Sequence, residues 1–111
     1  MNYKEAYDRL GGKEVRKLRG TATTLETRDG GAIAVKYYDT DIVTFYPDGA
    51  VRFDNGGYKT ASTKAKMSEW TYHRVYQEKH EWYITTDEGV VDYYNGITLK
   101  DGRVVCPSTH K

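Results

Sequence analysis

The first hydrophobic pattern lies at the start of the chain and has the period of a helix. Apolar side chains recur there at spacings of three and four residues, which places them in one stripe on a helix. The stripe consists of Tyr3, Ala6, Tyr7 and Leu10. Asn2 is a suitable N-cap, and the Gly11-Gly12 pair is a stop signal. These signals predict a short helix over residues 2–10.

From residue 20 onward, short runs of β-branched and aromatic residues are separated by turn signals. Asp29-Gly30-Gly31 predicts a hairpin turn, and Pro47-Asp48-Gly49 predicts a tight turn after a buried strand. A second helix is predicted over 63–70, with Ser62 or Thr63 as its cap. The expected strands are 21–27, 33–38, 42–46, 50–54, 74–78, 82–86, 90–94, 97–99 and 103–106.

Strands that follow one another every 8 to 12 residues through tight turns favour antiparallel meanders. We therefore expect an α+β fold: an antiparallel sheet of meander hairpins, strongly bent or split into two layers. A short N-terminal helix and one mid-chain helix accompany a β-rich core over residues 20–106. The length of 111 residues and the absence of an evident linker indicate one domain over residues 1–111.

Composition narrows the classes of partner. The chain has 17 basic and 16 acidic residues, so its formal charge of +1 argues against a protein that coats a nucleic-acid duplex. The same balance argues against an acidic mimic of nucleic acid, although local patches of either sign remain possible. No apolar run approaches the about 20 residues of a membrane span, so we expect no membrane association. The single Cys106 fits a reducing cytoplasm.

A glycine pair leads through a hydroxyl-rich loop into the predicted mid-chain helix. Backbone N–H groups at a helix N-terminus attract anions, and lysines nearby add positive charge. A nucleotide or nucleic-acid phosphate would be the natural ligand, whereas the alternative is a capped helix with solvated lysines. The spacing is not that of a Walker A loop. The candidate residues are Gly56, Gly57, Lys59, Thr60, Ser62, Thr63, Lys64 and Lys66.

A second basic cluster follows the N-terminal helix. Basic residues near aromatic rings hold single-stranded nucleic acid by charge and stacking, although nearby acidic residues make a solvated face the alternative. The cluster comprises Arg9, Lys13, Arg16, Lys17 and Arg19.

Tyrosine is unusually common, with eleven residues against two phenylalanines. Alternation along a strand directs one ring of an adjacent pair inward and the other outward. The outward rings would form an amphipathic surface of the kind enriched in protein interfaces, unless they simply cover the sheet. The candidate interface residues are Tyr37, Tyr38, Tyr58, Tyr72, Tyr76, Tyr83, Tyr93 and Tyr94.

Signals for catalysis are poor. His73, His80 and His110 lack the spacing of metal ligands, and Cys106 has no partner cysteine. We expect no catalytic residues, no metal and no cofactor, and hence a protein that is not an enzyme.

Several ordered segments of the chain resemble a family of small bacteriophage and prophage proteins. The segments are Ala32–Lys36, Thr40–Phe45, Pro47–Gly49, Gly56–Thr60 and Thr63-Lys64. The likeness extends over about residues 20–105. Tyr37-Tyr38 stands where a histidine is frequent in the family, and Ala61-Ser62 departs from its Thr-rich loop.

The resemblance implies a biological context rather than an activity. It implies expression from a phage or mobile element in the cytoplasm of a bacterial host. By analogy with small phage proteins that act by binding, we expect an inhibitor that occludes a host protein or nucleoprotein complex, for example an anti-CRISPR. The alternatives are a nucleotide or nucleic-acid binding module that uses the Gly56–Lys66 loop, and a virion structural or assembly protein. The sequence leaves the oligomeric state open.

Overall fold

The computed structural model describes residues 1–105, and the first element follows local signals closely. Helix α1, Tyr3–Leu10, begins at the N-cap Asn2 and is followed by Gly11 in the left-handed conformation, with φ of 60°. The Asn2 side chain accepts a hydrogen bond from the Glu5 amide at 2.9 Å, and the Glu5 carboxylate accepts one from the Asn2 amide at 3.2 Å. This capping box satisfies two donors that the helix itself leaves free. The predicted N-terminal helix is confirmed.

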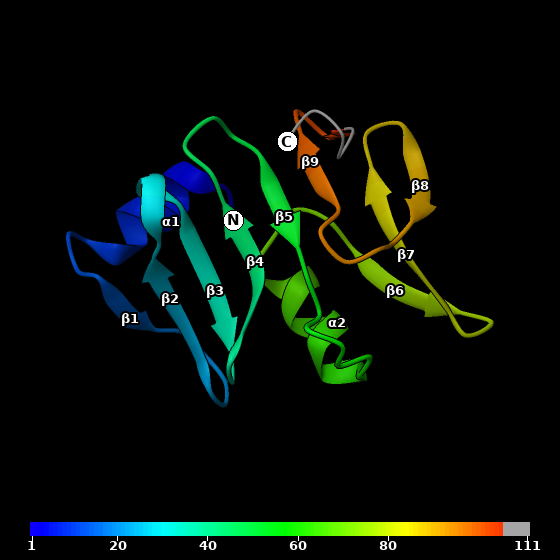
Figure 1. Cartoon of the computed structure of the whole chain (residues 1–111), viewed down its shortest axis with the longest axis horizontal. Coiled ribbons are helices and arrows are strands. Elements are labelled where there is room, and N and C mark those ends of the chain that lie inside the picture. The colour runs from blue at the N-terminus through cyan, green and yellow to red at the C-terminus, as the bar shows by residue number, and fades with distance from the viewer. Residues whose placement is uncertain (106–111) are drawn as a thin grey trace.

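The strands form two antiparallel sheets, which confirms the α+β class (Figure 1). The larger sheet has the order β1-β2-β3-β4-β5-β9-β10, and the smaller has the order β6-β7-β8. The strands are β1 Val15–Lys17, β2 Thr23–Thr27, β3 Ile33–Tyr37, β4 Thr40–Phe45, β5 Val51–Phe53, β6 Val75–Glu78, β7 Glu81–Thr86, β8 Gly89–Asp92, β9 Thr98–Lys100 and β10 Arg103–Val104. Strands β1 to β5 form a meander, and β9 returns from beyond the small sheet to pair with β5.

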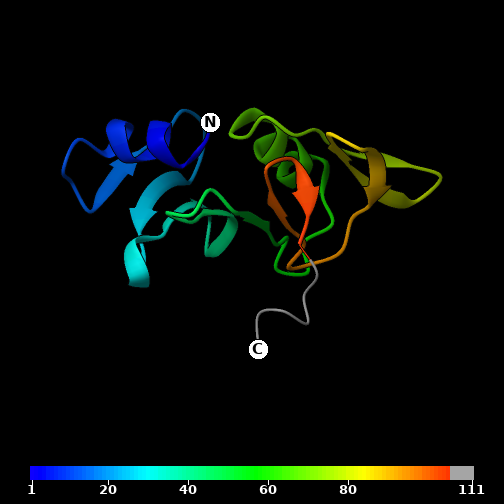
Figure 2. The same ribbon diagram turned by 90° about the horizontal axis from the view of Figure 1, so that it is seen from above.

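One row of side chains forms the centre of the core. Leu25, Val35, Val43 and Phe53 lie opposite one another on β2 to β5, and none of them is exposed to solvent. Both helices cover this face of the larger sheet (Figure 2). Val75, Trp82 and Ile84 of the small sheet belong to the same hydrophobic cluster. The two sheets therefore share one core.

Two local predictions need correction. The mid-chain helix α2, Ala61–Glu69, starts two residues before the predicted 63, because the Thr60 hydroxyl accepts from the Thr63 amide and acts as the cap. By contrast, the hairpin turn predicted at Asp29–Gly31 is confirmed, because these residues form a 3₁₀ turn between the paired strands β2 and β3. Strand β1 precedes the predicted start of the β-rich core at residue 20. Its three residues are all exposed, so it carries no alternation that a sequence could reveal.

The predicted strand 103–106 is shorter in the described part of the chain, since β10 ends at Val104. Cys106 and His110 lie outside the described residues. Every other predicted strand has a counterpart whose ends differ by at most two residues, which is the usual uncertainty of strand boundaries.

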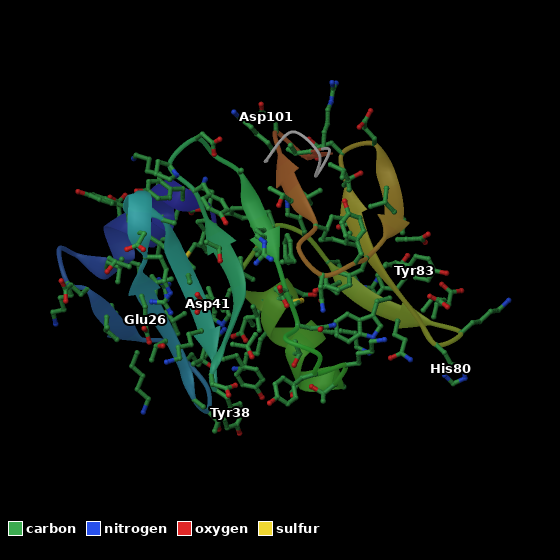
Figure 3. All side chains as sticks on the ribbon, in the orientation of Figure 1. Glu26, Tyr38, Asp41, His80, Tyr83 and Asp101 are labelled. Carbon is green, nitrogen blue, oxygen red and sulfur yellow. The ribbon has the colours of Figure 1, made fainter. Side chains whose placement is uncertain are left out.

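The face of the larger sheet opposite the helices carries an ion-pair network (Figure 3). Arg28 binds both carboxylate oxygens of Asp41, at 2.8 and 2.7 Å, and its third guanidinium nitrogen contacts Glu26 at 3.1 Å. The Thr24 hydroxyl and then Arg28 hold the pKa of Glu26 below its ordinary value of 4.5. The network joins β2, β4 and the turn that follows β2.

We expect Arg28→Ala to lower the free energy of unfolding by about 1 kcal/mol at pH 7, because a two-point contact between Arg and a carboxylate is lost. Arg28→Lys keeps the charge without the planar fork, so its loss should be smaller. Because the pKa of Glu26 is lower in the folded protein than in the unfolded chain, the ionised carboxylate stabilises the fold at pH values above about 4.5, and this contribution is lost as the pH falls. The difference between wild type and Arg28→Ala should therefore shrink as pH falls below that value. Urea denaturation between pH 3 and pH 7 measures it, and a constant difference would contradict the assignment.

Candidate functional site

A surface groove of about 740 Å³ lies between the β3–β4 turn and the loop that leads into α2. It brings together residues that are 20 or more positions apart in the chain. Its lining consists of Ala22, Tyr37, Tyr38, Asp39, Thr40, Ile42, Asn55, Tyr58, Thr60, Ser62 and Thr63. We call this feature the tyrosine groove. It unites two candidate sites of the sequence, the hydroxyl-rich loop and part of the tyrosine set.

The first wall of the tyrosine groove is the end of β3. Tyr37 is half-buried and Tyr38 is 61% exposed. Tyr38 lies beyond the end of β3, so the two rings line the same groove and do not alternate to opposite faces of the sheet. Their rings meet edge to face with centroids 4.8 Å apart. Tyr38 has φ of 56°, and its amide donates to the Ala22 carbonyl at 2.9 Å. This contact fixes the turn that presents the exposed ring.

The second wall is the loop from Asn55 to Thr60. The buried Asn55 accepts from the Gly57 amide through its side chain at 2.8 Å and from the Tyr58 amide through its carbonyl at 2.9 Å. The Gly56 amide donates to the Asp54 carboxylate at 2.8 Å. These bonds order the loop and leave Tyr58 56% exposed.

Gly56 is the tight point of this wall, because a Cβ there would lie 2.7 Å from Thr40 Oγ1. We expect Gly56→Ala to lower the free energy of unfolding by about 1–3 kcal/mol, since backbone strain at φ of 62° adds to that collision. Thr40→Ala should recover part of this loss. Thr40→Ala should not recover the loss caused by Gly57→Ala, because a Cβ at position 57 has no atom within 4 Å. Thermal unfolding of the single and double variants measures the coupling energy between each glycine and Thr40. Equal coupling of Gly56 and Gly57 to Thr40 would contradict the close contact at Gly56.

The floor of the tyrosine groove carries the hydroxyls at the start of α2. Thr60 Oγ1 lies 3.1 Å from Ser62 Oγ and 3.0 Å from Thr63 Oγ1, and it accepts from the Thr63 amide at 3.2 Å. Hydroxyls both donate and accept, so this cluster offers adaptable hydrogen bonding beside the aromatic rings.

The predicted anion site is only partly assembled. The amides of Gly56 and Gly57 already donate to side-chain oxygens, so they do not form a free cradle for a phosphate. Lys64 binds Gln77 at 2.6 Å and lies 5.0 Å from the Trp82 ring. Lys66 contacts the Arg19 carbonyl at 3.3 Å and Glu69 at 3.7 Å. Lys59 lines a separate hollow of about 230 Å³.

The second basic cluster does not form one continuous patch, because two of its arginines pack against Trp70, which the sequence pattern did not identify. The guanidinium groups of Arg9 and Arg19 lie 5.3 and 5.9 Å from the ring of the buried Trp70. Arg19 also pairs with Glu69 at 2.6 Å. The remaining members, Lys13, Arg16 and Lys17, are exposed on and before β1. Two of the five basic side chains, Arg9 and Arg19, are therefore held in cation–π contacts with Trp70.

The eight candidate tyrosines do not form one surface. Tyr37, Tyr38 and Tyr58 line the tyrosine groove, whereas Tyr76 and Tyr83 lie on the small sheet with ring centroids 5.7 Å apart. Figure 3 shows Tyr38 and Tyr83 in different parts of the molecule.

The other three tyrosines have separate environments. Tyr93 packs against Trp82 and donates to the Asn95 side chain at 2.9 Å, and burial raises the pKa of its hydroxyl. Tyr72 donates to Glu5 at 2.6 Å. Tyr94 lines a hollow of about 650 Å³ beside β5. Burial and local hydrogen bonds thus occupy two of these side chains.

Within residues 1–105, no group of three or more His, Cys, Asp and Glu side chains is placed to hold a metal ion. The His73 ring packs edge-on against Phe53 at 6.0 Å, and its Nδ1 lies 3.0 Å from the Thr85 carbonyl. His80 is exposed in the β6–β7 turn. In the same part of the chain, no helix has the length and apolar character to cross a bilayer.

The fold and the tyrosine groove define a small antiparallel-sheet protein with an open groove lined by three tyrosines. The chain belongs to the Kyanoviridae Gp96 protein family, whose sequence model matches residues 5–100. This is a family of phage proteins, so the phage resemblance seen in the sequence is confirmed. Neither the curated proteins nor the solved structures gave a match to the chain.

Proposed function

We propose that this phage protein is a non-enzymatic inhibitor that binds a host protein through the tyrosine groove. The target we favour is a component of a host defence system, such as a CRISPR effector, and inhibition would occur by covering one of its working surfaces. The observation that carries this proposal is the convergence of Tyr37, Tyr38 and Tyr58 with the hydroxyls of α2 in one groove.

The chemistry of the groove suits protein recognition. A tyrosine side chain gives a large amphipathic contact area and has few rotatable bonds to immobilise, while serine, threonine and asparagine adapt their hydrogen bonds to the partner. Two of the rings are already more than half exposed on ordered backbone. The entropic cost of binding is therefore reduced in advance.

A nucleotide or short single-stranded nucleic acid is the second candidate ligand, because the start of α2 opens into the same groove. Two observations weigh against a phosphate ligand. The amides of Gly56 and Gly57 already donate to side chains of the loop, and Lys64 and Lys66 donate to groups outside the groove. Aromatic stacking alone would have to supply most of the affinity.

Affinity capture from host lysate, followed by a functional challenge, tests the proposal. Tagged wild-type protein should retain one host protein that a groove variant, Tyr38→Ala with Tyr58→Ala, does not retain. Expression of the wild type should also protect an incoming phage or plasmid from the host's defence. A melting temperature raised by a nucleotide panel but no specific protein capture would overturn the proposal in favour of the second candidate. Stable self-association without capture would favour the virion assembly role.

A further inference from the structure

The outer face of the small sheet combines two tyrosines with three carboxylates. Strand pairing places Tyr76 opposite Tyr83, and Tyr83 opposite Asp92. Glu78 and Glu81 lie opposite each other at the end of the same hairpin. Because side chains alternate along a strand, these five residues share the face that points away from the buried Val75 and Ile84. We call them the acidic tyrosine face.

Arg74 is on the same face as Tyr76, but it stacks on the Tyr76 ring and forms no ion pair with the three carboxylates among the described residues. Among residues 1–105, no ion pair involves Glu78, Glu81 or Asp92. Like charges directly opposite each other across a strand pair destabilise the pairing, so Glu78 and Glu81 are unfavourable neighbours in the free protein. Burial and the charges of Asp92, Glu81 and Glu78 raise the pKa of the Tyr83 hydroxyl. A positively charged partner group would relieve this repulsion.

The structure also shows which cation suits the face. The guanidinium of Arg74 lies 4.8 Å from the centre of the Tyr76 ring. Guanidinium groups stack on aromatic rings and pair with carboxylates through two parallel hydrogen bonds. Tyr83 and the three carboxylates offer the same two contacts to an arginine from outside. The three carboxylates repel the phosphates of a nucleic acid, so this face favours a basic protein segment.

We propose that the acidic tyrosine face binds an arginine-containing basic segment of a partner protein. The face shares no residue with the tyrosine groove, so this second contact does not depend on the function proposed for the groove. Arginine would stack on Tyr83 and pair with the flanking carboxylates. A bound guanidinium would reduce the repulsion between Glu78 and Glu81. This relief would make the free energy of binding more favourable at this face.

Fluorescence anisotropy with a labelled peptide of alternating arginine and glycine tests the proposal on the full chain. The test variant carries Glu78→Gln, Glu81→Gln and Asp92→Asn. The matched control carries Asp8→Asn, Glu14→Gln and Asp29→Asn, which change the net charge equally but lie outside the small sheet. We expect at least about tenfold weaker binding for the test variant and less than about twofold for the control.

Two further measurements separate recognition from general attraction. A peptide of alternating lysine and glycine should bind more weakly than the arginine peptide, and Tyr83→Leu should reduce that preference because it removes the ring. Melting temperatures check that each variant folds, and the test variant should not melt below wild type. Equal weakening in both triple variants, or no binding by wild type, would overturn the proposal. A wild-type dimer that the test variant dissolves would also overturn it, because the occupant would then be a second copy.

Discussion

Phe53→Ala is expected to lower the free energy of unfolding by about 3–5 kcal/mol, a large part of the roughly 5–15 kcal/mol that stabilises a small domain. The Phe53 ring is fully buried on β5 and belongs to the hydrophobic cluster that also contains Val75, Trp82 and Ile84 of the small sheet. It packs edge-on against His73, which lies two residues before β6 of the small sheet, and its backbone bonds to Ile97 and Gly96 at 2.9 and 2.8 Å. Alanine would leave a cavity in the centre of the shared core.

Chemical denaturation followed by tryptophan fluorescence and by circular dichroism measures this effect. Trp82 lies in the small sheet and Trp70 at the end of α2, so fluorescence reports both regions. One shared core predicts coincident transitions for the two signals. Phe53→Leu should lose roughly half as much stability, because its cavity is smaller. A loss below about 1.5 kcal/mol, or separate transitions in the wild type, would contradict the single core.

The second large effect concerns binding. Tyr38→Ala with Tyr58→Ala is expected to weaken binding of the captured host protein by about a hundredfold or more, since buried tyrosines at interface centres each contribute about 2 kcal/mol or more. The two rings are 61% and 56% exposed in the free protein, so stability should change little. Titration calorimetry with the purified target measures the affinity.

Tyr7→Ala is the matched control for this variant. Tyr7 is 64% exposed, like the two groove tyrosines, but it lies on α1. It should leave the affinity unchanged. If Tyr7→Ala weakened binding as much as the double variant, general tyrosine exposure rather than the groove would explain the interaction.

Local signals made much of the fold predictable. Helix α1 depends on Asn2, an apolar stripe and Gly11, all within ten residues of one another. The buried row of Leu25, Val35, Val43 and Phe53 follows from alternation on four consecutive strands. These features require no knowledge of distant contacts, and sequence patterns are therefore sufficient for them.

Features that depend on distant partners were not predictable. Strand β1 has three exposed residues and exists because β2 supplies its hydrogen-bond partners. The return of β9 to β5 joins segments more than 40 residues apart, so hairpin signals could not reveal which sheet it enters. The sequence identified hairpins but left the division into two sheets open.

The candidate site shows the same limit. The hydroxyl-rich loop and the Tyr37-Tyr38 pair were each identified, but only the fold places them on facing walls of one groove. The charge pattern also suggested that Lys64 and Lys66 would serve the loop. Their contacts with Gln77 and the Arg19 carbonyl depend on β6 and on the segment before β2.

Site-specific photocrosslinking tests the tyrosine groove as the binding surface most directly. A photoreactive benzoylphenylalanine replaces the tyrosine at position 58 in one protein and at position 7 in another, and both are illuminated in host lysate. The groove predicts a covalent adduct with one host protein from position 58 and none from position 7. Adducts of equal yield from both positions, or an adduct from position 7 alone, would contradict it.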